Sequence, residues 1–185
     1  MEQDHHDRFV AALKPIIPAA RLLIPKHFEH LFAVGEESTD WEVRYPGVKV
    51  MTEFEEVRQM EELHPVGSVE PWHTAVSAKL DAVLQPGVES SMSVRDITAT
   101  PPVYGGGIGT PFPLNGGVAL TGGPDSWDHS IAVVGLIRAR VFTEMEGMHL
   151  IQYSYPGIKG SCEFAGLSMS DYTALMHDIW SLRII

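Results

Sequence analysis

The sequence predicts an α+β protein in which a mainly antiparallel β-sheet closes into a barrel or a strongly curved roll. Three observations support this prediction: segments in which apolar and polar residues alternate, Pro-Gly turn signals between these segments, and helical patterns near the N-terminus, at mid-chain and at the C-terminus. Short strands joined by tight turns favour antiparallel pairing. A chain of 185 residues is long enough for a core of its own, so we expect a single domain over 1–185, with residues 1–6 flexible.

The N-terminal region is expected to be helical. Residues 7–13 carry apolar side chains on one side of a short helix, which Pro15 and Pro18 interrupt because proline lacks an amide hydrogen. A second helix begins at Pro25, in the favoured first turn, and ends before Gly35, in the favoured position past a helix end.

The following segment predicts a hairpin and then the mid-chain helix. Residues 41–51 alternate between apolar and polar positions on the two sides of a turn at Pro46. Thr52 and Glu55 have the spacing of a capping box, and apolar residues recur at helical spacing through 52–63. We therefore expect the order strand, turn, strand, helix.

More strands are predicted in the second half of the chain. Residues 74–84 fit the period of a strand and that of a helix, and the turn signal at 85–87 with continued alternation through 88–94 favours a second hairpin. Residues 130–143 are rich in isoleucine and valine and predict a central, covered strand. Residues 149–155 are expected to form the next strand, which runs back beside the strand at 130–143.

Composition and charge limit the partners. The formal net charge is −11, with 44% hydrophobic and 20% charged residues. Such a charge repels phosphate backbones and anionic lipid surfaces, so neither nucleic acid nor a membrane is an expected partner. Cys162 is the only cysteine, the N-terminus lacks the pattern of a secretory signal, and no apolar run is long enough to span a bilayer, so we expect a cytoplasmic protein.

Residues 99–129 are dense in glycine and proline and predict a long loop that contains one short strand at 118–121. The apolar side chains within this loop argue against a disordered segment. No Lys or Arg occurs between Arg95 and Arg138, so a phosphate-binding loop is not expected. The loop either closes over a ligand at the mouth of the barrel or packs on the core as a purely structural segment.

Asp125, His129 and Tyr104 are the candidate catalytic residues. Asp125 and His129 lie where the predicted loop meets the predicted central strand. Histidine titrates near neutral pH, and burial raises the pKa of a carboxylate toward neutral pH, so either residue would serve as a general base. Tyr104 would orient the substrate or donate a hydrogen bond. The alternatives are that Asp125 is a turn residue and that His129 is a hydrogen-bonded histidine at the sheet edge.

A second set of residues is predicted to contact the ligand, through hydrogen bonds from polar side chains and apolar contacts from aromatic ones. Segments 45–54 and 155–164 both begin with Tyr-Pro-Gly and end with Glu-Phe, which indicates either a repeated type of turn or two walls of one cavity. The predicted set comprises Thr110, Phe112, Asn115, Trp127, Tyr45, Glu53, Tyr155 and Glu163.

No metal site and no cofactor are predicted. His27 and His30 lie one helical turn apart in the predicted second helix, but a metal site needs at least a third ligand and supporting residues. Cys162 lies beside Glu163, whose charge disfavours a thiolate nucleophile.

These observations favour two functions. The first is a β-barrel that binds a small organic ligand, with or without activity as a cofactor-independent isomerase, cyclase or lyase that acts by positioning and proton transfer on an uncharged substrate. The alternative is a non-catalytic acidic interaction protein: an inhibitor, an immunity factor or an assembly subunit. Residues 168–185 have the pattern of an amphipathic helix, and the apolar end of this helix at 180–185 is a candidate homo-oligomer contact.

Overall fold

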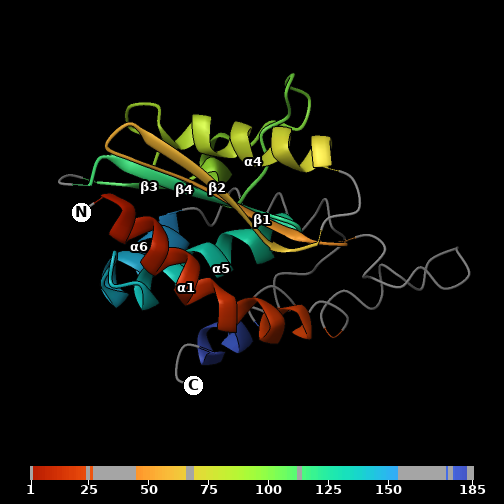
Figure 1. Ribbon diagram of the computed structural model, residues 1–185, viewed down its shortest axis with the longest axis vertical. Coiled ribbons are helices and arrows are strands. Elements are labelled where there is room, and N and C mark those ends of the chain that lie inside the picture. The colour runs from red at the N-terminus through yellow and green to blue at the C-terminus, as the bar shows by residue number, and fades with distance from the viewer. Residues whose placement is uncertain are drawn as a thin grey trace, which may run out of the picture.

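The structure is a computed structural model, and it describes residues 2–23, 26, 45–65, 69–111, 114–153, 174 and 177–182. Its helices and strands are α1 (Glu2–Arg21), β1 (Val48–Phe54), β2 (Val57–His64), α4 (Val69–Val83), the 3-10 helix η1 (Ser91–Val94), β3 (Gly107–Thr110), β4 (Gly116–Thr121), α5 (Asp125–Arg138) and α6 (Glu144–Tyr153). The four strands form one antiparallel sheet in the order β2-β1-β4-β3. Helix α4 covers one face of the sheet, and helices α1 and α5 cover the other (Figure 1).

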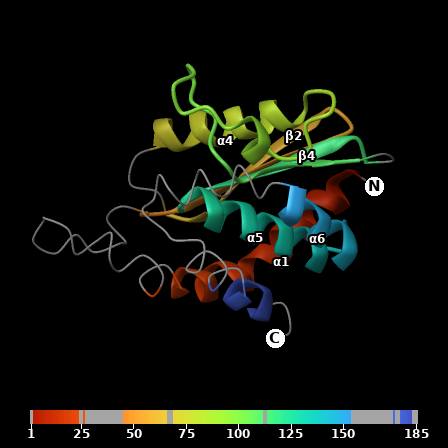
Figure 2. The same cartoon turned by 180° about the vertical axis from the view of Figure 1, so that it is seen from behind.

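The sheet is open, with β2 and β3 as its two edges. The α+β class is therefore confirmed, but the predicted barrel is wrong. Segments 74–84 and 130–143, which the sequence predicts as strands, lie mainly in α4 and α5, and too few strands remain to close a barrel. Seen from behind, α5 and α6 lie side by side on the face opposite α4 (Figure 2).

Helix α1 runs through both of its prolines to Arg21, so the predicted interruption at Pro15 and Pro18 is wrong. Both prolines are exposed, and the carbonyl groups that lose their helical partner belong to Ala11 and Lys14, which are exposed as well and can bind water. The residues buried on the opposite side of α1 are Phe9, Leu13, Ile16, Ile17 and Ala20. Their burial outweighs the loss of two backbone hydrogen bonds. Residues 2–6, predicted to be flexible, form the first turns of this helix.

The mid-chain helix predicted over 52–63 is a β-hairpin. β1 pairs with β2, and Phe54 lies opposite Val57 at the end of the ladder. Glu55 and Glu56 form the turn with φ angles of 50° and 69°. Positive φ at both central residues is what a tight type I′ hairpin turn requires.

Helix α4 takes the place of the second predicted hairpin. Val76, Leu80 and Val83 lie on one side of α4 and are buried against β1 and β4. Of the two periods that residues 74–84 fit, the helical one is therefore correct. The partner strand predicted at 88–94 is absent as well, because this segment contains η1 and an isolated bridge.

Residues 99–129 contain β3, β4 and the first turn of α5 in place of one long loop. The short strand predicted at 118–121 is confirmed as part of β4. Glycine is required where backbones approach closely: Gly106 has a φ of 113°, and a Cβ there would lie 2.7 Å from both the Leu120 carbonyl oxygen and the Asp128 Cβ. This segment is packed into the domain instead of covering a barrel mouth.

Helix α5 occupies the region predicted as a central strand. Its residues from Ser126 to Leu136 are all buried, so α5 is enclosed on every side and lacks the polar stripe of an amphipathic helix. The returning strand predicted at 149–155 is also wrong in its described part, because α6 extends to Tyr153. The α1–α5 layer and the sheet together enclose the main hydrophobic core.

Other predictions lie wholly or largely outside the described residues. They concern the helix at 25–34, of which only Lys26 is described, and the strand at 41–44. Within the predicted C-terminal helix, residues 174 and 177–182 are described and are helical, as expected. No helix in the described part of the chain is long and apolar enough to cross a membrane.

Thr143 and Glu146 form a reciprocal cap at the start of α6. The Thr143 amide and hydroxyl donate to Glu146 Oε2 over 2.7 and 2.8 Å, and the Glu146 amide donates to Thr143 Oγ1 over 3.3 Å. Thr143→Ala is expected to lower the free energy of unfolding, measured by urea denaturation, by about 1 kcal/mol. Thr143→Ser keeps the hydroxyl and should lose much less, so equal losses in the two variants would contradict the cap.

Candidate functional site

A cavity of about 610 Å³ lies between the C-terminal end of α4, the β3–β4 hairpin and α6. We call it the α4–α6 cavity. Val83, Leu84 and Val88 line it from α4 and the turn that follows, and Phe142 and Leu150 line it from the opposite side. Phe142 and Leu150 also belong to the main hydrophobic core. The lining is therefore largely apolar and is held by packed secondary structure.

Three titratable side chains also line the α4–α6 cavity: Glu89, Glu146 and His149. His149 Nε2 lies 3.9 Å from Glu89 Oε2, so the turn after α4 and helix α6 face each other here. Hydrogen bonds from Thr143 hold the pKa of Glu146 below its ordinary value, so this carboxylate is charged at neutral pH. Among the described residues, no Lys or Arg lines the cavity.

Thr110 and Asn115, which the sequence predicts as ligand contacts, both line the α4–α6 cavity. Thr110 ends β3, and its Oγ1 accepts a hydrogen bond from the Gly116 amide over 3.0 Å. Asn115 precedes β4 with a φ of 39°, a backbone conformation that asparagine tolerates better than most residues. The hairpin therefore brings two hydrogen-bonding side chains to an otherwise apolar lining.

The other predicted ligand contacts that the structure describes lie elsewhere. Trp127 is fully buried on α5, and its indole N–H donates to a carbonyl of α1 over 3.1 Å. Tyr45 is half-buried against the main core, and Glu53 on β1 pairs with Arg58 on β2 over 2.7 Å. None of these side chains lines the α4–α6 cavity. Phe112, Tyr155 and Glu163 lie outside the described residues.

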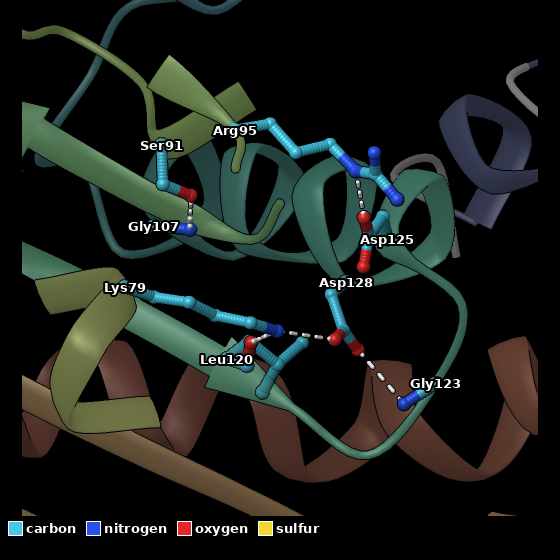
Figure 3. A network of polar contacts seen from close by, with 8 residues as sticks. All are labelled: Lys79, Ser91, Arg95, Gly107, Leu120, Gly123, Asp125 and Asp128. Carbon is cyan, nitrogen blue, oxygen red and sulfur yellow. Dashed lines mark hydrogen bonds and ion pairs between the residues drawn. The ribbon is translucent and has the colours of Figure 1, made fainter. Parts of the chain in front are cut away.

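The three candidate catalytic residues do not line the α4–α6 cavity either. Asp125 lies in the first turn of α5, where its Oδ2 accepts a hydrogen bond from Arg95 Nε over 2.6 Å (Figure 3). His129 follows one turn later and is fully buried, and Tyr104 is half-buried in the segment before β3. Asp125 and His129 thus lie on one helix, but Asp125 is held in a part-buried contact with Arg95 and His129 lies in a buried contact with Ser90.

A buried ion pair joins helices from the two sides of the sheet. Lys79 of α4 donates to Asp128 Oδ2 of α5 over 2.7 Å and to the Leu120 carbonyl over 2.8 Å (Figure 3). Asp128 Oδ1 accepts from the Gly123 amide over 3.0 Å, and both charged side chains are 1% exposed. Burial raises the pKa of the Asp128 carboxyl to about 7, although the Lys79 ammonium favours its charged form.

His129 is the second buried titratable group of α5. Its Nδ1 lies 3.3 Å from Ser90 Oγ, and its Nε2 has no hydrogen-bond partner among the described residues. Burial lowers the pKa of His129 to about 4, so the imidazole is neutral at pH 7. With His129 and Asp128 both inside the fold, neither reaches a ligand in the α4–α6 cavity, and both act on stability.

Comparisons of the chain with known protein families, curated proteins and solved structures found no match. In the described residues, no group of three or more His, Cys, Asp or Glu side chains is placed to hold a metal ion.

Sequence reasoning missed the acidic and histidine side chains of the cavity, Glu89 and His149. One signal was available for His149: Thr143 and Glu146 have capping-box spacing, which marks the start of α6 and places His149 about one turn further along it. Nothing comparable marks Glu89, because it lies in a turn whose neighbours come from distant parts of the chain.

Proposed function

We propose that this protein binds a small organic molecule with an apolar body in the α4–α6 cavity. The observation that carries the proposal is the cavity itself, which has a volume of about 610 Å³ and a largely apolar lining with a few polar side chains. Ligand pockets in proteins typically enclose about 300–1,000 Å³ and have this kind of lining. Thr110 and Asn115 supply hydrogen-bonding groups that would orient the ligand.

The proposal is for binding and assigns no chemical step. Isomerisation, cyclisation or elimination needs an acid or base within hydrogen-bond reach of the substrate. Asp125, His129 and Tyr104 do not line the cavity, so they give no support to catalysis there. The titratable groups that do line it, Glu89, Glu146 and His149, are given only a binding role in this proposal.

Val88→Trp is expected to fill the α4–α6 cavity and weaken ligand binding. Val88 lines the cavity from the turn after α4, and an indole in its place would occupy the space of the ligand. With the uncharged fluorophore naphthylmethanol as the probe, we expect equilibrium dialysis to show at least about tenfold weaker binding, a loss of about 1.4 kcal/mol.

The matched control is Val94→Trp, the same substitution at a residue of η1 that is 41% exposed and does not line the cavity. It should bind the probe like the wild type. Equal weakening in the two variants, or no saturable binding to the wild-type protein, would contradict the proposed function.

A second candidate function is docking of a partner protein. Two large apolar side chains of α6, Met145 and Met148, are 78% and 53% exposed, and Met145 also lines the cavity. Exposed methionine is typical of surfaces that adapt to partners, and the charge of −11 favours a basic one. Absence of ligand binding to the wild-type protein would favour this function over the first.

A further inference from the structure

We infer that the ligand of the α4–α6 cavity is a cation, an organic ammonium ion joined to an apolar or aromatic body. This inference rests on the proposed binding function and names the class of ligand that the cavity selects. It follows from the charged side chains around the cavity and from the apolar part of its lining.

Two carboxylates on opposite sides of the cavity supply negative charge. Glu89 lies in the turn after α4 with its side chain 51% exposed, and Glu146 lies in the first turn of α6. Among the described contacts, the hydrogen bonds that Glu146 accepts from Thr143 both end on Oε2. Glu146 Oε1 is therefore available to an ammonium group.

The two helix ends at the cavity offset each other. The C-terminal end of α4 carries the equivalent of about half a negative charge, and the first turn of α6, which also lines the cavity, carries about half a positive charge. The carboxylates of Glu89 and Glu146 therefore set the sign of the potential. His149 is the one basic side chain among the described residues of the lining. An anionic ligand would therefore be repelled at this site.

The apolar part of the lining determines the chemistry of the uncharged part of the ligand. Val83, Leu84, Val88, Phe142 and Leu150 enclose space for a hydrocarbon or aromatic group, and such surface gives a small inorganic cation no contacts. A metal ion would need several close oxygen or nitrogen ligands, and the described residues offer no such group. A ligand with a positive charge at one end of an apolar body matches both the carboxylates and the apolar lining.

Three ligands with the same aromatic ring and different charges test the inference: naphthylmethylammonium, naphthylmethanol and naphthoate. Binding to the full chain is measured by equilibrium dialysis at about pH 8, above the ordinary titration range of imidazole. We expect the ammonium ion to bind about fivefold more tightly than the alcohol, and naphthoate to bind more weakly than either. The preference for the cation should shrink as salt is added, because ions screen exposed charges.

Glu89→Gln removes one charge at the cavity, and Glu144→Gln is its control. Glu144 is an exposed carboxylate on α6 that does not line the cavity. Glu89→Gln should lower the ratio of ammonium to alcohol affinity about twofold to threefold, while Glu144→Gln leaves it nearly unchanged. An equal drop in both variants would trace the preference to net charge and would overturn the inference.

The outcomes separate the two proposals. Saturable binding of naphthylmethanol without a preference for the ammonium ion would overturn the cation inference and leave the binding function standing. Absence of binding by all three ligands would overturn both.

Discussion

Asp128→Asn is expected to lower the free energy of unfolding by about 3–5 kcal/mol. The substitution leaves the Lys79 ammonium, which is 1% exposed, without the carboxylate that it contacts over 2.7 Å. Removing one partner of a buried ion pair is costly because the remaining charge stays away from water. The measurement is urea denaturation at about pH 8, above the pKa of about 7 that burial gives Asp128.

Two further variants test the cause of this loss. Lys79→Met in the Asp128→Asn background removes the ammonium group that has lost its carboxylate partner, and it should restore part of the stability. Asp81→Asn breaks the exposed contact between Arg58 and Asp81 and should cost at most about 1 kcal/mol. If Asp128→Asn costs no more than Asp81→Asn, the buried pair contributes no more than a surface pair.

The position of Lys79 and Asp128 explains why the pair matters to this fold. Lys79 belongs to α4 on one face of the sheet, and Asp128 belongs to α5 on the other (Figure 3). Both also bond to the chain around β4, through the Leu120 carbonyl and the Gly123 amide. The pair therefore fixes both helices relative to the strand between them. The C-terminal end of α4 lines the α4–α6 cavity, so the Lys79–Asp128 pair also helps to hold that side of the cavity in place.

The overall class was predictable from the sequence, but the assignment of helix or strand failed where tertiary contacts decide it. The pattern Thr-x-x-Glu shows this at two places. At Thr52 it predicts a helix, yet β1 lies between β2 and β4, which supply backbone partners on both sides. At Thr143 the same pattern does begin a helix. Capping-box spacing alone does not distinguish these cases, because strand pairing depends on distant residues.

Helix α5 shows a second physical reason. It is buried on all sides, so its apolar residues have no period that separates a helix from a strand, and Ile131, Val133 and Val134 have high strand propensity. The helical signal lay upstream, in Pro124 followed by Asp125 and Asp128 in the first turn. The glycines and prolines before these residues instead predict that they end a loop.

The candidate site was predictable only in part. Thr110 and Asn115 lie together at the α4–α6 cavity because the hairpin that holds them is local in sequence, and their contact with a ligand stays a prediction. The rest of the cavity comes from α4 and α6, whose helical character was not predicted in either case. A cavity formed by three segments that are distant along the chain leaves no single pattern in the sequence.

His129→Gln is expected to remove a pH-dependent part of the stability. Burial lowers the pKa of His129 from 6.5 to about 4 in the folded chain. Between these values the unfolded chain binds a proton that the folded chain does not, so the neutral imidazole contributes stability above about pH 6.5 and loses it as the pH falls toward 4. At 1.36 kcal/mol for each pH unit, the change amounts to about 3 kcal/mol.

Burial also lowers the pKa values of His6 and His64, so more than one histidine contributes to the pH dependence of stability. Subtracting the stability of the His129→Gln variant from that of the wild type isolates the contribution of His129. We expect the stability of the wild type minus that of the variant to fall by about 3 kcal/mol between about pH 7 and pH 4 in a series of urea titrations. A difference that stays constant would mean that the fold accepts a charged imidazole at this position, and the unpartnered Nε2 would then need a hydrogen-bond acceptor inside the core.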